Sequence, residues 1–325
     1  MNDLMGAIGG YFSLELPQPK EHHHPNLLYF QSARAAFYAL LQAGLPRKVW
    51  MPYYICDSML SPLYEIGVPV SFYSLNSDFS VKDDIELLDG EWIFYVNYFG
   101  ISGAEQNRLL SKYPKEQLVF DHSQAFFQKP LECLATIYSP RKFFGVPDGG
   151  MLSTKLKIRS DFVQDESSYD RTTHLLKRAC FTPEKGYTDY QMSESGLLSC
   201  QPKGMSVFTN NLLKTIDYAV VKNKRNSNFW YLHEALASAN KIQIDRMYVD
   251  GPMVYPFLTD NASLKSKLIQ RRIFIPTYWP EVGQRGDLGV FERKLLSNLN
   301  ALPCDQRYSV NEMDSILRLI DEYKR

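Results

Sequence analysis

The sequence lacks long apolar runs and net charge. None of its apolar stretches approaches the roughly 20 residues that a membrane-spanning helix needs, so we expect no membrane partner. Lysine and arginine together number 36, and so do aspartate and glutamate. A chain with balanced charges has no global field that attracts nucleic acid. The opening residues do not resemble a secretory leader, so these absences favour a protein that works in the cytoplasm.

Cysteine is scarce, and the common nucleotide-binding motifs are missing. The five cysteines are odd in number and widely spaced, which indicates free thiols in a reducing cytoplasm rather than a disulfide or zinc framework. Neither G-x-G-x-x-G nor G-x-x-x-x-G-K-[ST] occurs, which argues against a Rossmann dehydrogenase and a P-loop protein. His22, His23 and His24 are consecutive, so their side chains point in different directions and do not predict a metal site. We expect them in an exposed loop.

Apolar runs alternate with helical patterns between residues 27 and 153. This alternation predicts an α/β fold with a mainly parallel sheet between helical layers, and the length leaves room for a smaller second domain. We divide the chain into an N-terminal arm (1–26), a large domain (27–210), and a long connecting helix with a small C-terminal α/β domain (211–325). Further expectations are a short strand at 11–16, a helical piece at 169–178 and one long helix over 210–236.

Residues 135–151 read ATIYSPRKFFGVPDGGM and centre on Lys142. Arg141 precedes this lysine, Phe143 and Phe144 follow it, and a bend rich in glycine comes next. A second cation and partial desolvation both favour the neutral amine, which is the form that attacks a carbonyl. The alternative is an ordinary surface lysine on a turn.

A short buried strand, Leu-Val-Phe, ends at Asp121, upstream of Lys142. Ligands of open α/β sheets bind at the carboxyl ends of the strands. An acid and an amine at two such ends form the pair that a pyridoxal 5′-phosphate (PLP) enzyme needs. The lysine forms a Schiff base, and the aspartate keeps the pyridine nitrogen protonated. The alternative role for Asp121 is to cap a helix.

Together these segments resemble a known family. The pattern D-x-x-Q-A from Asp121, followed about twenty residues later by S-x-R-K-(apolar)2-x-x-P-D-G-G, is similar to the DegT/DnrJ/EryC1/StrS family of PLP-dependent nucleotide-sugar aminotransferases, which have PLP fold type I. The resemblance covers residues 9–325 and is densest over 31–151. It implies that Lys142 carries the cofactor, that Asp121 pairs with the pyridine nitrogen, and that Gln124 approaches the ring hydroxyl.

The resemblance also implies cofactor contacts elsewhere. A strand, a small polar turn and a helix start meet at Ser32 and Ala33, which are expected to hold the cofactor phosphate, although Ser32 could simply cap the helix. Ser139 adds a phosphate contact. The position of the ring-stacking aromatic falls near Cys56, which cannot stack in the same way, so Tyr53 or Tyr54 is expected to stack instead. Asn97 contacts the ring or the substrate, or else closes the turn before Gly100.

Two functions remain open at this point. The first is an aminotransferase that moves an amino group from an amino acid such as glutamate to a keto sugar of a nucleotide-sugar, in polysaccharide or lipopolysaccharide biosynthesis. A homodimer is implied, because active sites of the resembled family use both subunits. The second is a non-catalytic relative that binds PLP or a sugar nucleotide as a sensor or partner subunit. Retained Lys142 and Asp121 argue against it. Departures from the family pattern at Cys56, Asn97, Ile137, Asp148 and Ser206 indicate a divergent member.

Overall fold

A mixed sheet of seven strands forms the centre of the protein. The structure is a computed structural model that describes residues 8–159 and 161–323. The strand order is β1-β7-β6-β5-β4-β2-β3. The strands are β1 (Leu28–Phe30), β2 (Lys48–Pro52), β3 (Val70–Tyr73), β4 (Glu91–Val96), β5 (Leu118–Asp121), β6 (Ala135–Tyr138) and β7 (Gly150–Thr154). Strand β7 runs antiparallel to β1 and β6, whereas all other pairings are parallel.

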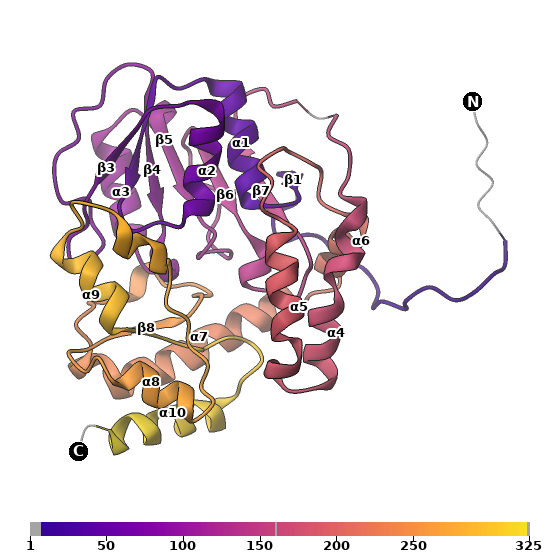
Figure 1. The fold of residues 1–325 in the computed structure, drawn as a ribbon, viewed down its shortest axis with the longest axis vertical. Coiled ribbons are helices and arrows are strands. Elements are labelled where there is room, and N and C mark those ends of the chain that lie inside the picture. The colour runs from indigo at the N-terminus through magenta and orange to yellow at the C-terminus, as the bar shows by residue number, and fades with distance from the viewer. Residues whose placement is uncertain (1–7, 160, 324–325) are drawn as a thin grey trace.

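Helices cover this sheet as the alternating pattern predicts. The central strands β4 and β5 are buried at every residue, which is typical of strands covered on both faces. Helix α1 (Ala33–Gly44) packs on α2 (Asp57–Ile66) and contacts β6 and β7, and α3 (Gly103–Lys112) contacts β5. Figure 1 shows α1 and α2 beside each other across the sheet. The predicted α/β class with a mainly parallel sheet is confirmed.

The C-terminal part has its own two-stranded sheet. Strands β8 (Tyr255–Leu258) and β9 (Leu299–Leu302) pair antiparallel. Around them lie α7 (Tyr218–Leu236), α8 (Leu264–Gln270), α9 (Val290–Asn298) and α10 (Val310–Glu322). This part, coloured orange to yellow, lies below the main sheet in Figure 1. The domain division itself stays a prediction, and its boundary at 210 falls inside α6 (Val207–Lys214). No helix in the described ranges has both the length and the apolarity to cross a membrane.

The prediction of one long helix over 210–236 is wrong. The chain forms α6 and then α7, with a break between Lys214 and Tyr218. Asp217 causes the restart, because its carboxylate accepts the backbone N–H of Val220 at 3.1 Å and so caps α7. The sequence Thr215-Ile216-Asp217 carried this signal.

The predicted strand at 11–16 is also wrong. Residues 12–22 form no regular element, and Figure 1 shows this arm running away from the body of the molecule. A strand needs a hydrogen-bonded neighbour, and no described strand pairs with the arm. The rings of Tyr11 and Phe12 are consequently almost fully exposed.

The helical piece predicted at 169–178 is part of a larger helical hairpin. A 3-10 turn (Glu166–Arg171) leads into α4 (Thr173–Cys180), which packs against α5 (Pro183–Ser195). Helix α5 was not predicted. Its start matches a common signal, because Pro183 occupies the first helical turn, where its missing N–H costs nothing.

The three histidines do not form an exposed loop as predicted. The Nε2 atom of His24 lies 2.7 Å from the carbonyl oxygen of Phe126, and its side chain is only 5% exposed. His23 stacks on the ring of Phe126, and His22 contacts Asn210 at 2.8 Å. Burial lowers the pKa of all three, and that of His24 to about 4. The described part of the chain holds no cluster of three metal-ligating side chains.

Candidate active site at the carboxyl edge of the sheet

The predicted site residues gather at one edge of the main sheet. The carboxyl ends of the parallel strands meet there, and the start of the reversed strand β7 lies at the same edge. The residues that follow the strand ends are Ser32 after β1, Cys56 after β2, Asn97 after β4, Ser139 and Lys142 after β6, with Asp121 as the last residue of β5.

Asp121 and Lys142 form the centre of this arrangement. Their strands are adjacent, and Asp121 pairs with Ile137 in the ladder. Asp121 is 4% exposed, and burial raises the pKa of its carboxyl, while the charge of Lys142 and the hydrogen bonds of Ser123 oppose this shift. Because the charge of Lys142 acts on the Asp121 carboxyl, the amine and the carboxylate belong to one site.

The expected partial desolvation of Lys142 is not observed. Its side chain is exposed, at the end of a 3-10 turn (Pro140–Lys142), whereas Phe143 and Phe144 are buried. Both rings pack against Phe126 and so anchor the turn in the core. The aromatic pair therefore holds the backbone and leaves the amine accessible.

Gln124 presents an unused hydrogen-bond donor. Its side chain is fully buried, and its Oε1 accepts the backbone N–H of Phe99 at 2.7 Å. Phe99 has a φ of 56°, a left-handed conformation that strains a non-glycine residue. Among the described residues, the Nε2 of Gln124 has no partner. A buried amide N–H without an acceptor is costly, so this donor is available to a ligand atom.

Ser32 and Ala33 begin helix α1 next to the lysine-bearing loop. The Ser32 hydroxyl accepts the N–H of Ala35 at 3.1 Å, so the capping role is observed. The N–H groups of Ala33 and Arg34, at the positively polarised start of the helix, have no acceptor within the helix, which suits a phosphate. Gly150 packs tightly here, because an added Cβ would lie 2.1 Å from the Ser32 carbonyl carbon.

The side chain of Asn97 has hydrogen-bond partners within the protein, whereas the hydroxyl of Ser139 does not in the described residues. The Nδ2 of Asn97 donates to Gln106 at 2.7 Å, and its Oδ1 accepts the N–H of Ser102 at 3.1 Å. Asn97 thus closes the turn after β4, and a cofactor contact stays a prediction. Ser139 is 9% exposed, and no hydrogen bond of its hydroxyl occurs within the described ranges. Its phosphate contact stays a prediction.

The structure brings Cys56, rather than Tyr54, to the Lys142–Asp121 pair. The charges of both groups act on the Cys56 thiol, whose pKa is raised mainly by burial. Tyr54 is buried, with its ring 4.8 Å from that of Trp279. Its stacking role stays a prediction without a contact to the pair. Register in the sequence already pointed to Cys56.

The acidic residue of Pro-Asp-Gly-Gly has a partner that the sequence did not reveal. Asp148 is fully buried and accepts the N–H of Ser206 at 2.8 Å and its hydroxyl at 2.7 Å, together with the hydroxyl of Thr209. Both Asp148 and Ser206 were departures from the family pattern. They pair with each other and tie the end of the lysine loop to the start of α6.

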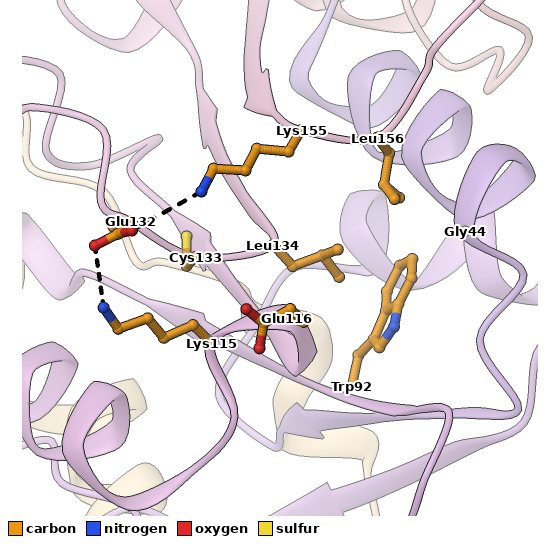
Figure 2. A pocket seen from close by; sticks show the side chains of 9 residues that line it. All are labelled: Gly44, Trp92, Lys115, Glu116, Glu132, Cys133, Leu134, Lys155 and Leu156. Atoms are coloured by element: carbon orange, nitrogen blue, oxygen red, sulfur yellow. Dashed lines mark hydrogen bonds and ion pairs between the residues drawn. The ribbon is translucent and has the colours of Figure 1, made fainter.

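Two cavities lie at opposite edges of the sheet. A groove of about 600 Å³ lies between α2 and residues 280–287, next to the site. Its charged lining residues are Arg285, Asp57, Glu281 and Asp287, an excess of carboxylates that disfavours a diphosphate. Figure 2 shows the second cavity, at the amino ends of the strands, where Glu132 contacts Lys115 at 3.0 Å and Lys155 at 3.9 Å. It lies away from the Lys142–Asp121 pair.

Comparisons with known proteins support the architecture. No protein-family model and no curated protein matches the sequence. Among solved structures, the chain is similar to the Streptococcus pneumoniae protein Spr1654, assigned as a sugar aminotransferase, with a TM-score of 0.64 at 14% identity, over 94% of this chain and 89% of that one. Spr1654 is also described in PLP and PMP forms.

Two further structures agree. A DegT DnrJ EryC1 StrS aminotransferase from Brucella abortus has a TM-score of 0.61 at 16% identity, over 91% of this chain and 85% of that one. The Helicobacter pylori aminotransferase PseC, of pseudoaminic acid biosynthesis, has a TM-score of 0.58 at 13% identity, over 91% and 86%. The low identities fit a divergent chain. This protein therefore has the fold of the PLP-dependent sugar aminotransferases.

Proposed function

We propose that this protein is a PLP-dependent aminotransferase of the DegT/DnrJ/EryC1/StrS type. It would transfer an amino group from an amino acid such as glutamate to the keto sugar of a nucleotide-sugar. The observation that carries the proposal is the Lys142–Asp121 pair at adjacent strand ends, on the fold of sugar aminotransferases. A binding module needs neither group.

The residues present fit PLP. The buried Nε2 of Gln124 lacks an acceptor, which the ring hydroxyl oxygen would supply. The first turn of α1 at Ser32 and Ala33 offers free N–H groups for the phosphate, and Ser139 has an unused hydroxyl nearby in the Lys142 turn. A glycine at 150 leaves the space that this turn requires.

PLP, when bound, acts as an electron sink for the bond broken at the substrate carbon. The chain's own groups do the rest. Lys142 is exposed at the site, so its amine can hold the cofactor and then move a proton as general base and acid. The carboxylate of Asp121 would supply a negative charge at a buried position, where it would favour a protonated ring nitrogen.

The test measures the absorbance of the bound cofactor and its response to borohydride reduction. The purified protein with added PLP is expected to show an absorbance band that disappears with borohydride and is absent in Lys142→Ala. Mass spectrometry of the reduced protein should place the adduct on Lys142. Lys155→Ala, which changes an exposed lysine at the opposite cavity, should leave the band intact. A wild-type protein that takes up no PLP contradicts the proposal.

Glutamate then separates catalysis from binding. In an aminotransferase, glutamate converts the bound cofactor to its amine form, and the band shifts accordingly. A coloured protein that does not respond to any amino acid would instead support the sensor or partner-subunit alternative. We further propose that the enzyme acts as a cytoplasmic homodimer in polysaccharide or lipopolysaccharide biosynthesis, which size measurements and a screen of nucleotide-sugars would test.

A further inference from the structure

An arginine is buried beside the lysine-bearing turn without an ion-pair partner. Arg225 lies on α7 and is only 2% exposed. Its guanidinium donates to the carbonyl oxygens of Pro252 at 2.9 Å, Met253 at 3.2 Å and Phe143 at 3.2 Å. It also lies 4.5 Å from the centre of the Phe143 ring. No ion pair of Arg225 occurs in the described chain, and its Nε has no partner.

A second side chain binds the same carbonyl oxygen. The Nε2 of Gln306, which follows β9, donates to the Phe143 carbonyl at 2.8 Å. Phe143 is the residue directly after Lys142. Its carbonyl therefore receives two donors from the C-terminal part of the chain, while its N–H closes the 3-10 turn on Pro140 at 2.9 Å. The backbone next to the lysine is held from both sides.

Burying a charge this deeply is costly. Burial lowers the pKa of Arg225, and the negative charges that Cys304 and Asp305 can carry oppose this shift only in part. Buried ion pairs can often be replaced by apolar residues of similar volume without loss of stability, so a buried charge is weak evidence of a stabilising role. In the described residues the guanidinium donates to three carbonyl oxygens, and its bond to Phe143 connects it to the turn that carries Lys142.

We propose that Arg225 and Gln306 are positioning residues that hold the Phe143 carbonyl and so orient Lys142 toward Asp121. This inference rests on the proposed function, since it assigns the orientation of the lysine that would carry PLP. The lysine side chain is exposed, and among the described residues no hydrogen bond or ion pair fixes its amine, which is only attracted to Asp121. Its direction is therefore set by the backbone of the turn. Small misplacements of a reacting group slow catalysis strongly.

We call the two donors on the Phe143 carbonyl, Arg225 and Gln306, the clamp. Two variants weaken the clamp, and a third variant provides a control. Gln306→Leu deletes one donor at similar volume, and Arg225→Lys keeps the charge but loses the planar fork. The control is Asn240→Ala. Asn240 follows α7 in the same C-terminal part, where its side chain donates to the Pro256 carbonyl at 2.8 Å and accepts the Leu258 N–H at 3.0 Å. This variant weakens the C-terminal part without changing a hydrogen bond to Phe143 or to the segment that carries Gln306.

Three measurements read the outcome. For Gln306→Leu and Arg225→Lys, we expect kcat to fall about tenfold with KM little changed. We also expect the pKa of the coloured lysine-bound band to shift by about half a unit. In protein without added cofactor, hydrogen exchange of the peptide covering 140–146 should be at least twofold faster. Asn240→Ala should lower the melting temperature and leave these three values unchanged.

The outcomes separate this inference from the proposed function. If the wild-type protein takes up no PLP, the proposed function is contradicted. The catalytic role of the clamp is then contradicted too, even if the variants show faster hydrogen exchange in the 140–146 peptide. If PLP binds but both variants keep the wild-type band pKa and exchange rate, only the clamp is overturned. Equal shifts in Asn240→Ala, at the same loss of melting temperature, would also overturn it.

Discussion

Asp121 and Lys142 bring opposite charges to one site, yet only the carboxylate is buried. Burial raises the pKa of Asp121, and the exposed Lys142 ammonium offsets this only in part. The folded state of the protein without cofactor therefore binds a proton at Asp121 more readily than the unfolded state does. The contribution of this group to stability is lost as the pH rises through the range between its unfolded and folded pKa.

The first prediction follows from this imbalance. Asp121→Asn removes the buried charge and keeps an acceptor for the Ser123 N–H, which Asp121 accepts at 2.7 Å. At pH 7 the cofactor-free variant should melt about 1–3 °C higher than the wild type, while transamination falls at least about 10²-fold. Calorimetry and a glutamate half-reaction measure the two effects. A lower melting temperature would show that burial is not the dominant influence on Asp121.

The second prediction concerns the contact between the lysine loop and α1. Gly150→Ala would place a Cβ 2.1 Å from the carbonyl carbon of Ser32, so one backbone segment must move. We expect a loss of about 1–3 kcal/mol in the free energy of unfolding and weaker PLP binding. Urea denaturation and equilibrium dialysis measure both. Gly145→Ala, in the same loop with its nearest neighbour at 3.6 Å, should change neither.

The third prediction concerns pH. Burial lowers the pKa of His24 to about 4 and that of His122 to about 3, from an ordinary value of 6.5. Below pH 6.5 the unfolded chain binds protons that the folded chain does not, so stability is complete above this value and falls as the pH drops toward 4.

The expected loss for His24 alone is about 3 kcal/mol between pH 7.5 and pH 4. Urea midpoints across this range measure it. His24→Gln keeps a donor for the Phe126 carbonyl and should flatten the lower part of the curve. An unchanged slope in this variant would mean that the arm detaches before the rest of the protein unfolds.

The fourth prediction compares two aspartates that bind the starts of helices. Asp148 is fully buried and accepts three donors at the start of α6, whereas Asp217 caps α7 in an exposed position. Asp148→Ala should cost about 3 kcal/mol, because its buried donors lose a charged acceptor. Asp217→Ala should cost about 1 kcal/mol. Equal costs would show that the burial of Asp148 does not strengthen its bonds.

The fold was predictable where a single pattern dominates a segment. Short apolar runs that end in polar residues identified β4, β5 and β6, and the position of Asp121 at a strand end followed directly. The pairing of Asp148 with Ser206 was not predictable, because it joins segments 58 residues apart and depends on tertiary packing. The break before α7 had a local signal in Asp217, which the continuous helical pattern concealed.

The chemistry of the site was predictable by residue type but not by environment. The motif placed Lys142 and Asp121 in one site, yet adjacent aromatics did not shield the lysine, since side chains next to each other in sequence can point in opposite directions. Likewise, three histidines between prolines gave no sign of the aromatic surface of Phe126 and Tyr138 that covers them. Burial depends on distant segments that no local window contains.

The reversed direction of β7 has one more consequence. Tyr138 and Met151 face each other across β6 and β7, so the segment between them is a closed connection of fixed span. Inserting one residue there would either bulge the loop that carries Lys142 or slip β7 by one position, which turns its side chains to the wrong face. Natural variants of this chain should therefore tolerate amino-acid substitutions in that connection far better than insertions or deletions.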